Sequence, residues 1–172
     1  MATTFTLISS TTLSASAASV TFSSIPSTYT DLVLRFSARS DRAALQCDLL
    51  FKLNSSTTGY SYTFVFGNGT SAGSSRGSNQ AQGYPGTIDA SSAVANTFTS
   101  GEIYIPSYTA SQNKPISSFV THEDNGTTVY YTGAWANLWQ NTAAITDIQL
   151  YPNNSTNFVS GSSFYLYGVK NS

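Results

Sequence analysis

Apolar and polar side chains alternate with a period of two through most of this chain. In DLVLRFSAR, which spans residues 31–39, Leu32, Leu34 and Phe36 fall on one face and Arg35 falls on the other. Successive side chains of a β-strand point to opposite faces, so this pattern predicts a half-buried antiparallel strand. No segment of helical length shows the period of about 3.6 residues that an amphipathic helix requires. We therefore expect the chain to fold from strands.

Runs of the same kind recur along the chain and predict roughly ten strands. They are filled with Ser, Thr, Val and aromatic residues, which strands prefer. Many short strands separated by Gly, Pro and Asn turns are typical of β-sandwiches and barrels. We predict an all-β, antiparallel β-sandwich that is jelly-roll-like, with roughly eight to ten strands in two four-stranded sheets plus edge elements. After a weak first strand around Phe5 and Leu7, the further runs are SVTFSSI, QCDLLFKLN, YSYTFVF, GEIYIPSY, KPISSFVTHE, TVYYTGAWA, AAITDIQLY and SSFYLYGVK.

The length of 172 residues predicts one domain with an attached arm. Residues 1–17 are small, polar and nearly free of charge, so we expect an N-terminal arm or an edge strand. Residues 18–172 are expected to form the single β-sandwich domain. Within it, GNGTSAGSSRGSNQAQGYPG at residues 67–86 predicts a long Gly/Ser-rich loop. Loops longer than about 12–15 residues are usually functional or disordered.

Charge is sparse and balanced, because only 9% of the residues are charged and the formal net charge is -1. Nucleic-acid binding requires a positive patch, and the basic residues are scattered, so we expect no nucleic-acid partner. No stretch approaches the roughly 18 apolar residues of a membrane span, and the first residues lack the pattern of a signal peptide. We therefore expect no membrane partner and folding in a cytoplasm. The single cysteine, Cys47, excludes an internal disulfide and a Cys-rich zinc site.

Two segments resemble catalytic motifs, and we predict that neither is one. HEDNG holds the only histidine, His122, but Asn125-Gly126 between alternating segments is a strong hairpin signal. We therefore predict a solvated hairpin tip and no metal or acid–base site. GSSRG at residues 73–77 matches a serine-hydrolase pattern that needs a strand-to-helix elbow, and no helix is predicted to follow it. We expect no catalytic residue, metal or cofactor, although a pair of acids could still cleave sugars.

Aromatic residues gather near the C-terminal third of the chain. Tyr130, Trp135 and Trp139 lie close together in sequence and allow two interpretations. They could form a flat platform for a glycan, or they could fill the core or a subunit interface. In the last predicted strand, Phe164 and Leu166 face one way, and Tyr165, Tyr167 and Val169 face the other, so the strand is apolar on both faces. This pattern suggests either a central position in a sheet or a second buried surface against another subunit. The candidate interface or glycan-contact residues are thus Tyr130, Trp135, Trp139, Tyr165 and Tyr167.

Three stretches resemble segments of small virion proteins of tailed bacteriophages, notably marine and cyanobacterial ones. They are SIPSTYTDLVLRFSARSD, EIYIPSYTASQNKPISS and ITDIQLYPNNSTNFVSGSSFYLYGVK, at residues 24–41, 102–118 and 145–170. Members of that group carry Ile-Pro-x-x-Tyr-x-Asp-Leu early, Ile-x-Ile-Pro-x-Tyr centrally and Gly-Ser-x-Phe-x-Leu-Tyr-Gly at the end. The resemblance extends from about residue 18 onward, and its motifs are structural.

The resemblance implies a jelly-roll virion structural protein without enzymatic activity. The expected role is a capsid decoration or cement protein, a homotrimer that contacts the major capsid protein or other virion proteins. Many copies would multiply weak hydrogen-bonded contacts. The expected location is the virion, assembled in the cytoplasm of the host bacterium. The alternative is a receptor-binding module of a tail or head fibre that holds a host surface glycan, and a small depolymerase or esterase is a third hypothesis.

Overall fold

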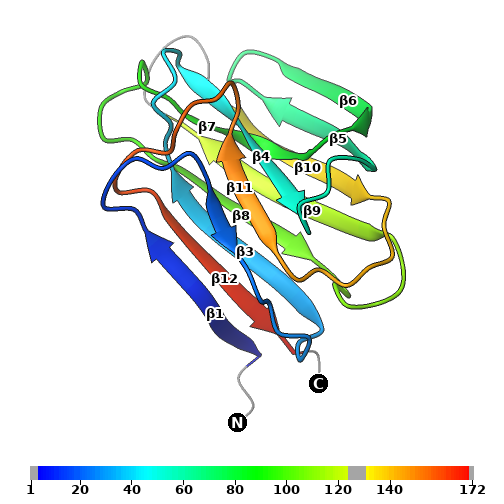
Figure 1. Cartoon of the computed structure of the whole chain (residues 1–172). Coiled ribbons are helices and arrows are strands. Elements are labelled where there is room, and N and C mark those ends of the chain that lie inside the picture. Colours follow the sequence, from blue (N-terminus) through cyan, green and yellow to red (C-terminus); the bar gives the residue numbers. More distant parts are fainter. Residues whose placement is uncertain (1–3, 124–130, 171–172) are drawn as a thin grey trace.

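The computed structural model describes residues 4–123 and 131–170 (Figure 1). Within these residues the chain forms twelve strands and no helix. All strand pairs are antiparallel, and the strands form two sheets. The predicted all-β, antiparallel sandwich is confirmed, with more strands than the predicted eight to ten.

The strands divide unequally between the sheets. The large sheet has eight strands in the order β1-β12-β3-β8-β9-β10-β5-β6, and the small sheet has four in the order β2-β11-β4-β7. This division differs from the expected pair of four-stranded sheets. The strands are β1 (Phe5–Thr12), β2 (Val20–Phe22), β3 (Asp31–Ala38), β4 (Gln46–Leu53), β5 (Tyr60–Gly67), β6 (Ala72–Gln80), β7 (Gly83–Asp89), β8 (Thr99–Ile105), β9 (Lys114–His122), β10 (Tyr131–Trp139), β11 (Ile148–Pro152) and β12 (Ser163–Val169).

The core lies between the two sheets and follows the alternation of the sequence. Leu32, Leu34 and Phe36 of β3 are buried together with Leu49 and Phe51 of β4. Each buried side chain of this kind contributes about 1.5–3 kcal/mol relative to an exposed one. In β3, the residues that alternate with Leu32, Leu34 and Phe36 lie on the opposite face of the large sheet, which points away from the small sheet. We call that surface the outer face.

The segment 67–86 is not a loop, and this prediction was wrong. Most of it belongs to β6 and β7, and β6 pairs with β5 at the edge of the large sheet. A Cβ at Gly73 or Gly77 would lie 2.6 Å from the ring of Phe66 or Tyr62, respectively. The glycines therefore make room for aromatic rings of the neighbouring strand, so their abundance indicates packing against β5. We call the β5–β6 hairpin the wing.

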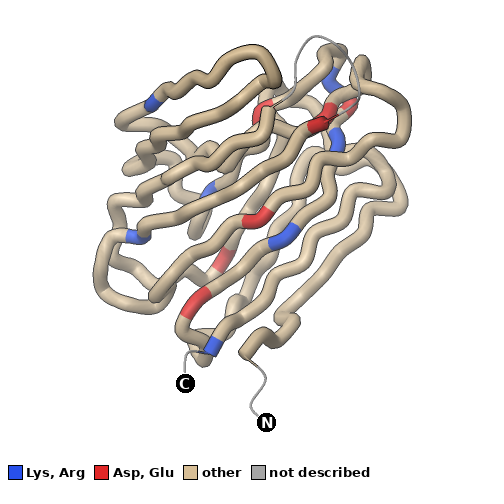
Figure 2. The backbone as a smooth tube through the Cα atoms, turned by 180° about the vertical axis from the view of Figure 1, so that it is seen from behind, with Lys and Arg blue, Asp and Glu red and all other residues tan. Residues whose placement is uncertain are grey.

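The N-terminal segment forms β1, the strand at the other edge of the large sheet. The prediction of an arm or an edge strand is thus resolved in favour of the strand. Cys47 of β4 is fully buried in the core. Charged residues are scattered along the described part of the chain (Figure 2). Its residues include no helix long and apolar enough to cross a membrane.

Candidate functional site

The outer face of the large sheet carries ordered rows of side chains. Because neighbouring strands pair in register, residues from different strands line up across the sheet. One such row crosses all eight strands of the large sheet, from β1 at one edge to β6 at the other. It combines aromatic, charged and small side chains. Its members are Ser10, Tyr165, Arg35, Glu102, Phe119, Ala134, Val65 and Ser74.

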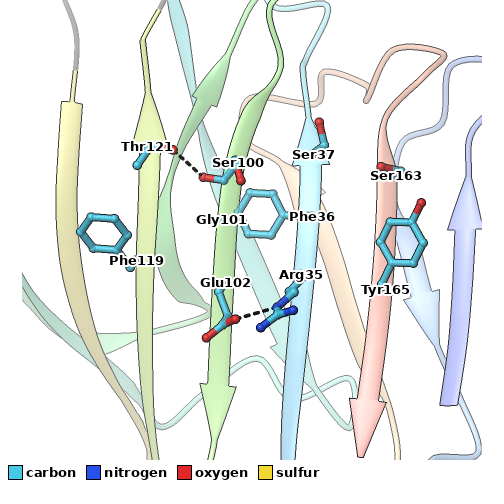
Figure 3. Close-up of a pocket in the computed structure, with 10 residues that line it drawn as sticks. All are labelled: Arg35, Phe36, Ser37, Ser100, Gly101, Glu102, Phe119, Thr121, Ser163 and Tyr165. Atoms are coloured by element: carbon cyan, nitrogen blue, oxygen red, sulfur yellow. Dashed lines mark hydrogen bonds and ion pairs between the residues drawn. The ribbon is translucent and has the colours of Figure 1, made fainter. Parts of the chain in front are cut away.

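An ion pair occupies the middle of this row. Arg35 Nε lies 2.7 Å from Glu102 Oε2, and the two side chains are 56% and 45% exposed. Tyr165 and Phe119 lie on opposite sides of the pair, and together they line an open depression of about 460 Å³ (Figure 3). An exposed pair of this kind contributes only about 0–1 kcal/mol to folding. Its charges therefore remain available to a partner that covers the face.

Arg35 also contacts two aromatic rings near the β1 edge. Its guanidinium carbon lies 5.8 Å from the ring centroid of Phe5 and 5.9 Å from that of Tyr167. Cations at such distances are attracted to the faces of aromatic rings. The ion pair is thus continuous with an aromatic patch contributed by β1 and β12.

A row of hydroxyl groups runs beside the ion pair. Six consecutive strands each place one Ser or Thr in this row, and most of these residues are exposed. Neighbouring strands lie about 4.8 Å apart, so the hydroxyls form a regular ladder of donors and acceptors. The members are Thr12, Ser163, Ser37, Ser100, Thr121 and Thr132.

Large apolar side chains are exposed on the outer face. Phe119 and Val65 are 55% and 57% exposed, and they line a second depression of about 620 Å³ with Ala134. Phe5 and Leu7 are 49% and 51% exposed on β1. Exposed apolar residues that gather on one face mark interaction surfaces. The outer face therefore has the composition of a protein-contact surface.

The structure divides the aromatic residues that the sequence singled out. Tyr165 and Tyr167 lie half-buried on the outer face, on the side that their parity predicted. Trp135 and Trp139 are 3% and 1% exposed and belong to the core cluster. They fill the core, so the core interpretation is confirmed for both, and the interpretation as an exposed flat platform for a glycan was wrong. Tyr130 lies outside the described residues.

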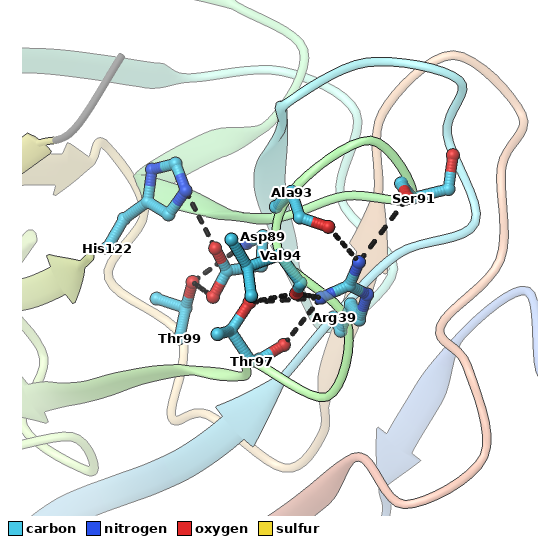
Figure 4. A network of polar contacts seen from close by, with 8 residues as sticks. All are labelled: Arg39, Asp89, Ser91, Ala93, Val94, Thr97, Thr99 and His122. Atoms are coloured by element: carbon cyan, nitrogen blue, oxygen red, sulfur yellow. Dashed lines mark hydrogen bonds and ion pairs between the residues drawn. The ribbon is translucent and has the colours of Figure 1, made fainter. Parts of the chain in front are cut away.

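The interpretation of His122 as part of a solvated hairpin tip was also wrong. His122 is 2% exposed, and its Nε2 lies 2.7 Å from Asp89 Oδ1 (Figure 4). Thr99 Oγ1 donates a hydrogen bond of 2.9 Å to Asp89 Oδ2. His122 shares the inward parity of Val120 in β9, which explains its burial. The proposed Asn125-Gly126 turn lies outside the described residues.

Arg39 extends this buried polar cluster. Its Nη1 donates to the carbonyl oxygens of Val94 and Thr97 at 2.8 and 2.9 Å, and its Nη2 donates to that of Ala93 at 2.9 Å (Figure 4). The guanidinium thus holds the segment that connects β7 to β8. Because Asp89 and His122 are enclosed, a substrate has no access to their polar atoms, and the cluster joins structural elements.

The remaining candidates for catalysis or metal binding also lack the geometry that such sites need. Ser75 of GSSRG lies in the extended strand β6, which continues toward β7 and lacks the elbow that the hydrolase pattern needs. Within residues 4–123 and 131–170, no group of three or more His, Cys, Asp or Glu side chains is arranged to hold a metal ion.

Comparisons with models of known protein families, with curated proteins and with solved structures found no match. The outer face is therefore identified as a candidate contact surface from the structure of this chain alone. Sequence reasoning did not connect Arg35 with Glu102, because they are 67 residues apart and only strand pairing brings them together. The alternating pattern did assign each of them to a strand, and knowledge of the strand order would have completed the row.

Proposed function

We propose that this protein is a non-enzymatic structural protein of a tailed-bacteriophage virion. It decorates or cements the capsid, and it binds its neighbours through the outer face of the large sheet. Three segments that resemble phage virion proteins support this assignment. The observation that carries the contact surface is the central row, in which the exposed Arg35–Glu102 pair is flanked by Tyr165 and Phe119.

The chemistry of the outer face suits repeated contacts between proteins. Exposed Val65 and Phe119 supply apolar area, the ladder of hydroxyls supplies hydrogen bonds, and Arg35 with Glu102 sets the register. A net charge of -1 limits repulsion between copies. In a homotrimer on a capsid, each weak contact is multiplied by the number of copies.

The receptor-binding alternative receives less support from the geometry. It depended on an exposed aromatic platform that included Trp135 and Trp139, and both indoles are buried. Tyr165 and Tyr167 remain on the outer face, but they adjoin charged and apolar groups that fit a protein partner equally well. The capsid-contact role is therefore the function that the geometry supports best.

Deletion of the gene from the phage that encodes it tests this role. We expect mass spectrometry to find the protein in purified wild-type virions, and we expect deletion virions to release their genome at a lower temperature. Added purified protein should restore the wild-type release temperature. Absence of the protein from purified virions would refute the proposal.

Two aspartate variants make the test specific for the outer face. Val65 lies on that face and is 57% exposed, whereas Val94 lies between β7 and β8 and is 50% exposed. Val65→Asp should fail to rebind deletion virions, because it places an unpaired charge in the contact. Val94→Asp should rebind like the wild type. Equal rebinding by both variants would exclude the outer face as the capsid contact.

A further inference from the structure

A cavity of about 250 Å³ lies between the wing and the small sheet, away from the outer face. We call it the aromatic cavity. Its walls include the rings of Phe64, Phe66, Tyr84, Tyr131 and Trp135. Phe64, Phe66 and Tyr84 are half-buried, so the cavity communicates with solvent. Ligand sites are typically concave, with apolar and aromatic walls and a few placed polar groups.

The rings of the cavity meet at a corner. Phe64 and Trp135 stack with an interplanar angle of 20° and a centroid distance of 5.6 Å. Tyr84 stands across both, at 84° to Phe64 and 83° to Trp135. A flat ligand fits best between parallel rings. Perpendicular walls instead suit a ligand with C–H groups on more than one side, such as a saturated ring.

Three polar atoms of the cavity residues are buried and have no hydrogen-bond partner among the described residues. They are Gln46 Oε1, Thr87 Oγ1 and Trp135 Nε1, and the three residues are among those that line the cavity. Buried polar groups in folded proteins are nearly always paired. They also differ in type, because the amide oxygen accepts, the indole N–H donates and the hydroxyl does both.

We propose that the aromatic cavity binds one neutral pyranose ring at the end of a glycan. The hydroxyls of a sugar donate and accept, which matches the mixed set of unpaired atoms on Gln46, Thr87 and Trp135. The C–H faces of the ring can pack against the perpendicular aromatic walls. The described residues that line the cavity include no Asp, Glu, Lys, Arg or His, which favours a neutral ligand. This inference does not depend on the capsid-contact role.

A second hollow would receive the next sugar of the glycan. It measures about 320 Å³ and shares Phe64 and Tyr84 with the aromatic cavity. Asp48 lines it and accepts hydrogen bonds of 3.3 Å from the Tyr84 hydroxyl and from Asn153 Nδ2. Burial, together with Asp48, raises the pKa of Tyr84, so its hydroxyl stays protonated. The carboxylate can accept from sugar hydroxyls and repels acidic sugars.

Titration with methyl glycosides of glucose, galactose, mannose and N-acetylglucosamine tests the proposal. Ligand-observed NMR should detect binding of at least one of them, with a dissociation constant of about 1 mM. Thr87→Val and Gln46→Met each remove one polar group and keep a similar shape. Each should weaken binding about three- to tenfold, as expected for one hydrogen bond. Thr63→Val, on the opposite face of β5, should leave affinity unchanged.

The stability of the free variant supplies an independent readout. If the Thr87 hydroxyl has no partner until sugar binds, Thr87→Val should unfold at the same temperature as the wild type or higher. A lower unfolding temperature would mean that the hydroxyl already bonds a trapped water, which would overturn the proposal. So would absence of binding by all four glycosides at about 10 mM, or binding of adenosine or uridine in their place. Sugar binding by a protein that is absent from virions would refute the capsid role alone.

Discussion

His122 Nε2 lies 2.7 Å from Asp89 Oδ1, and both side chains are buried. This contact joins β9 of the large sheet to β7 of the small sheet. Asp89 also accepts a hydrogen bond from Thr99, the first residue of β8. One carboxylate thereby links three strands. A mutation that removes either contact should weaken the junction between the two sheets.

Replacement of His122 by Ala should destabilise the protein by about 3 kcal/mol, because it leaves a buried carboxylate without its partner. Urea denaturation followed by fluorescence measures the change. Ser117→Ala, on the exposed face of the same strand, is the matched control and should change stability by less than about 0.5 kcal/mol. Equal stability of the two variants would show that the pair contributes nothing to the junction.

Tyr60 should make the fold sensitive to alkali. Burial raises its pKa from 10.0 to about 12, so the phenol ionises in the unfolded chain before it ionises in the folded one. The contribution of the neutral phenol to the free energy of unfolding is fully present below pH 10. It is lost as the pH rises through 12, by about 2–3 kcal/mol in total. Between pH 10 and 12, the free energy of unfolding of Tyr60→Phe should therefore fall by about 2–3 kcal/mol less than that of the wild type, as measured by denaturation at a series of pH values. Parallel curves for the two proteins would contradict the assignment.

Alanine should have opposite effects at two glycines of the wing. A Cβ at Gly77 would meet the ring of Tyr62 at 2.6 Å, whereas a Cβ at Gly67 would meet nothing within 4 Å. Gly77→Ala should therefore destabilise the protein by about 1 kcal/mol. Gly67→Ala should stabilise it by about 0.5 kcal/mol, because it restricts the unfolded chain. Thermal unfolding compares them, and an equal gain for both would place the Tyr62 ring elsewhere.

Exchange of the central charges should separate assembly from folding. Arg35→Glu and Glu102→Arg each place like charges side by side on the outer face, and each should weaken the proposed homotrimer in sedimentation velocity. The double swap restores the pair and should recover part of the association. All three should fold with changes below about 1 kcal/mol, because the pair is exposed. If both single variants associate as the wild type does, the interface lies elsewhere.

The period of two predicted the strands and their faces correctly where one face is buried. In β3, Leu32, Leu34 and Phe36 enter the core, and Arg35 remains exposed, as the alternation requires. The same reasoning failed for Gly73 and Gly77, because small residues usually signal turns. Here they accommodate rings of another strand, and that need arises only once β5 and β6 are paired.

The burial of the polar residues could not be predicted, because their partners lie far away in the sequence. His122 and Asp89 are far apart in the chain, and a hairpin signal beside His122 suggested exposure. The aromatic cavity was missed for the same reason. YSYTFVF marked an aromatic strand, but Gln46 and Thr87 meet Phe64 only after the two sheets pack.

The burial of Cys47 has a practical consequence for mapping the surface of the protein. Its thiol is the only one in the chain and is fully enclosed. A maleimide dye should therefore leave the folded wild type unmodified and react with a cysteine introduced at any chosen exposed position. Spectroscopic labels can thus be attached one at a time without first removing the native cysteine, and slow reaction at Cys47 itself reports how often the fold opens.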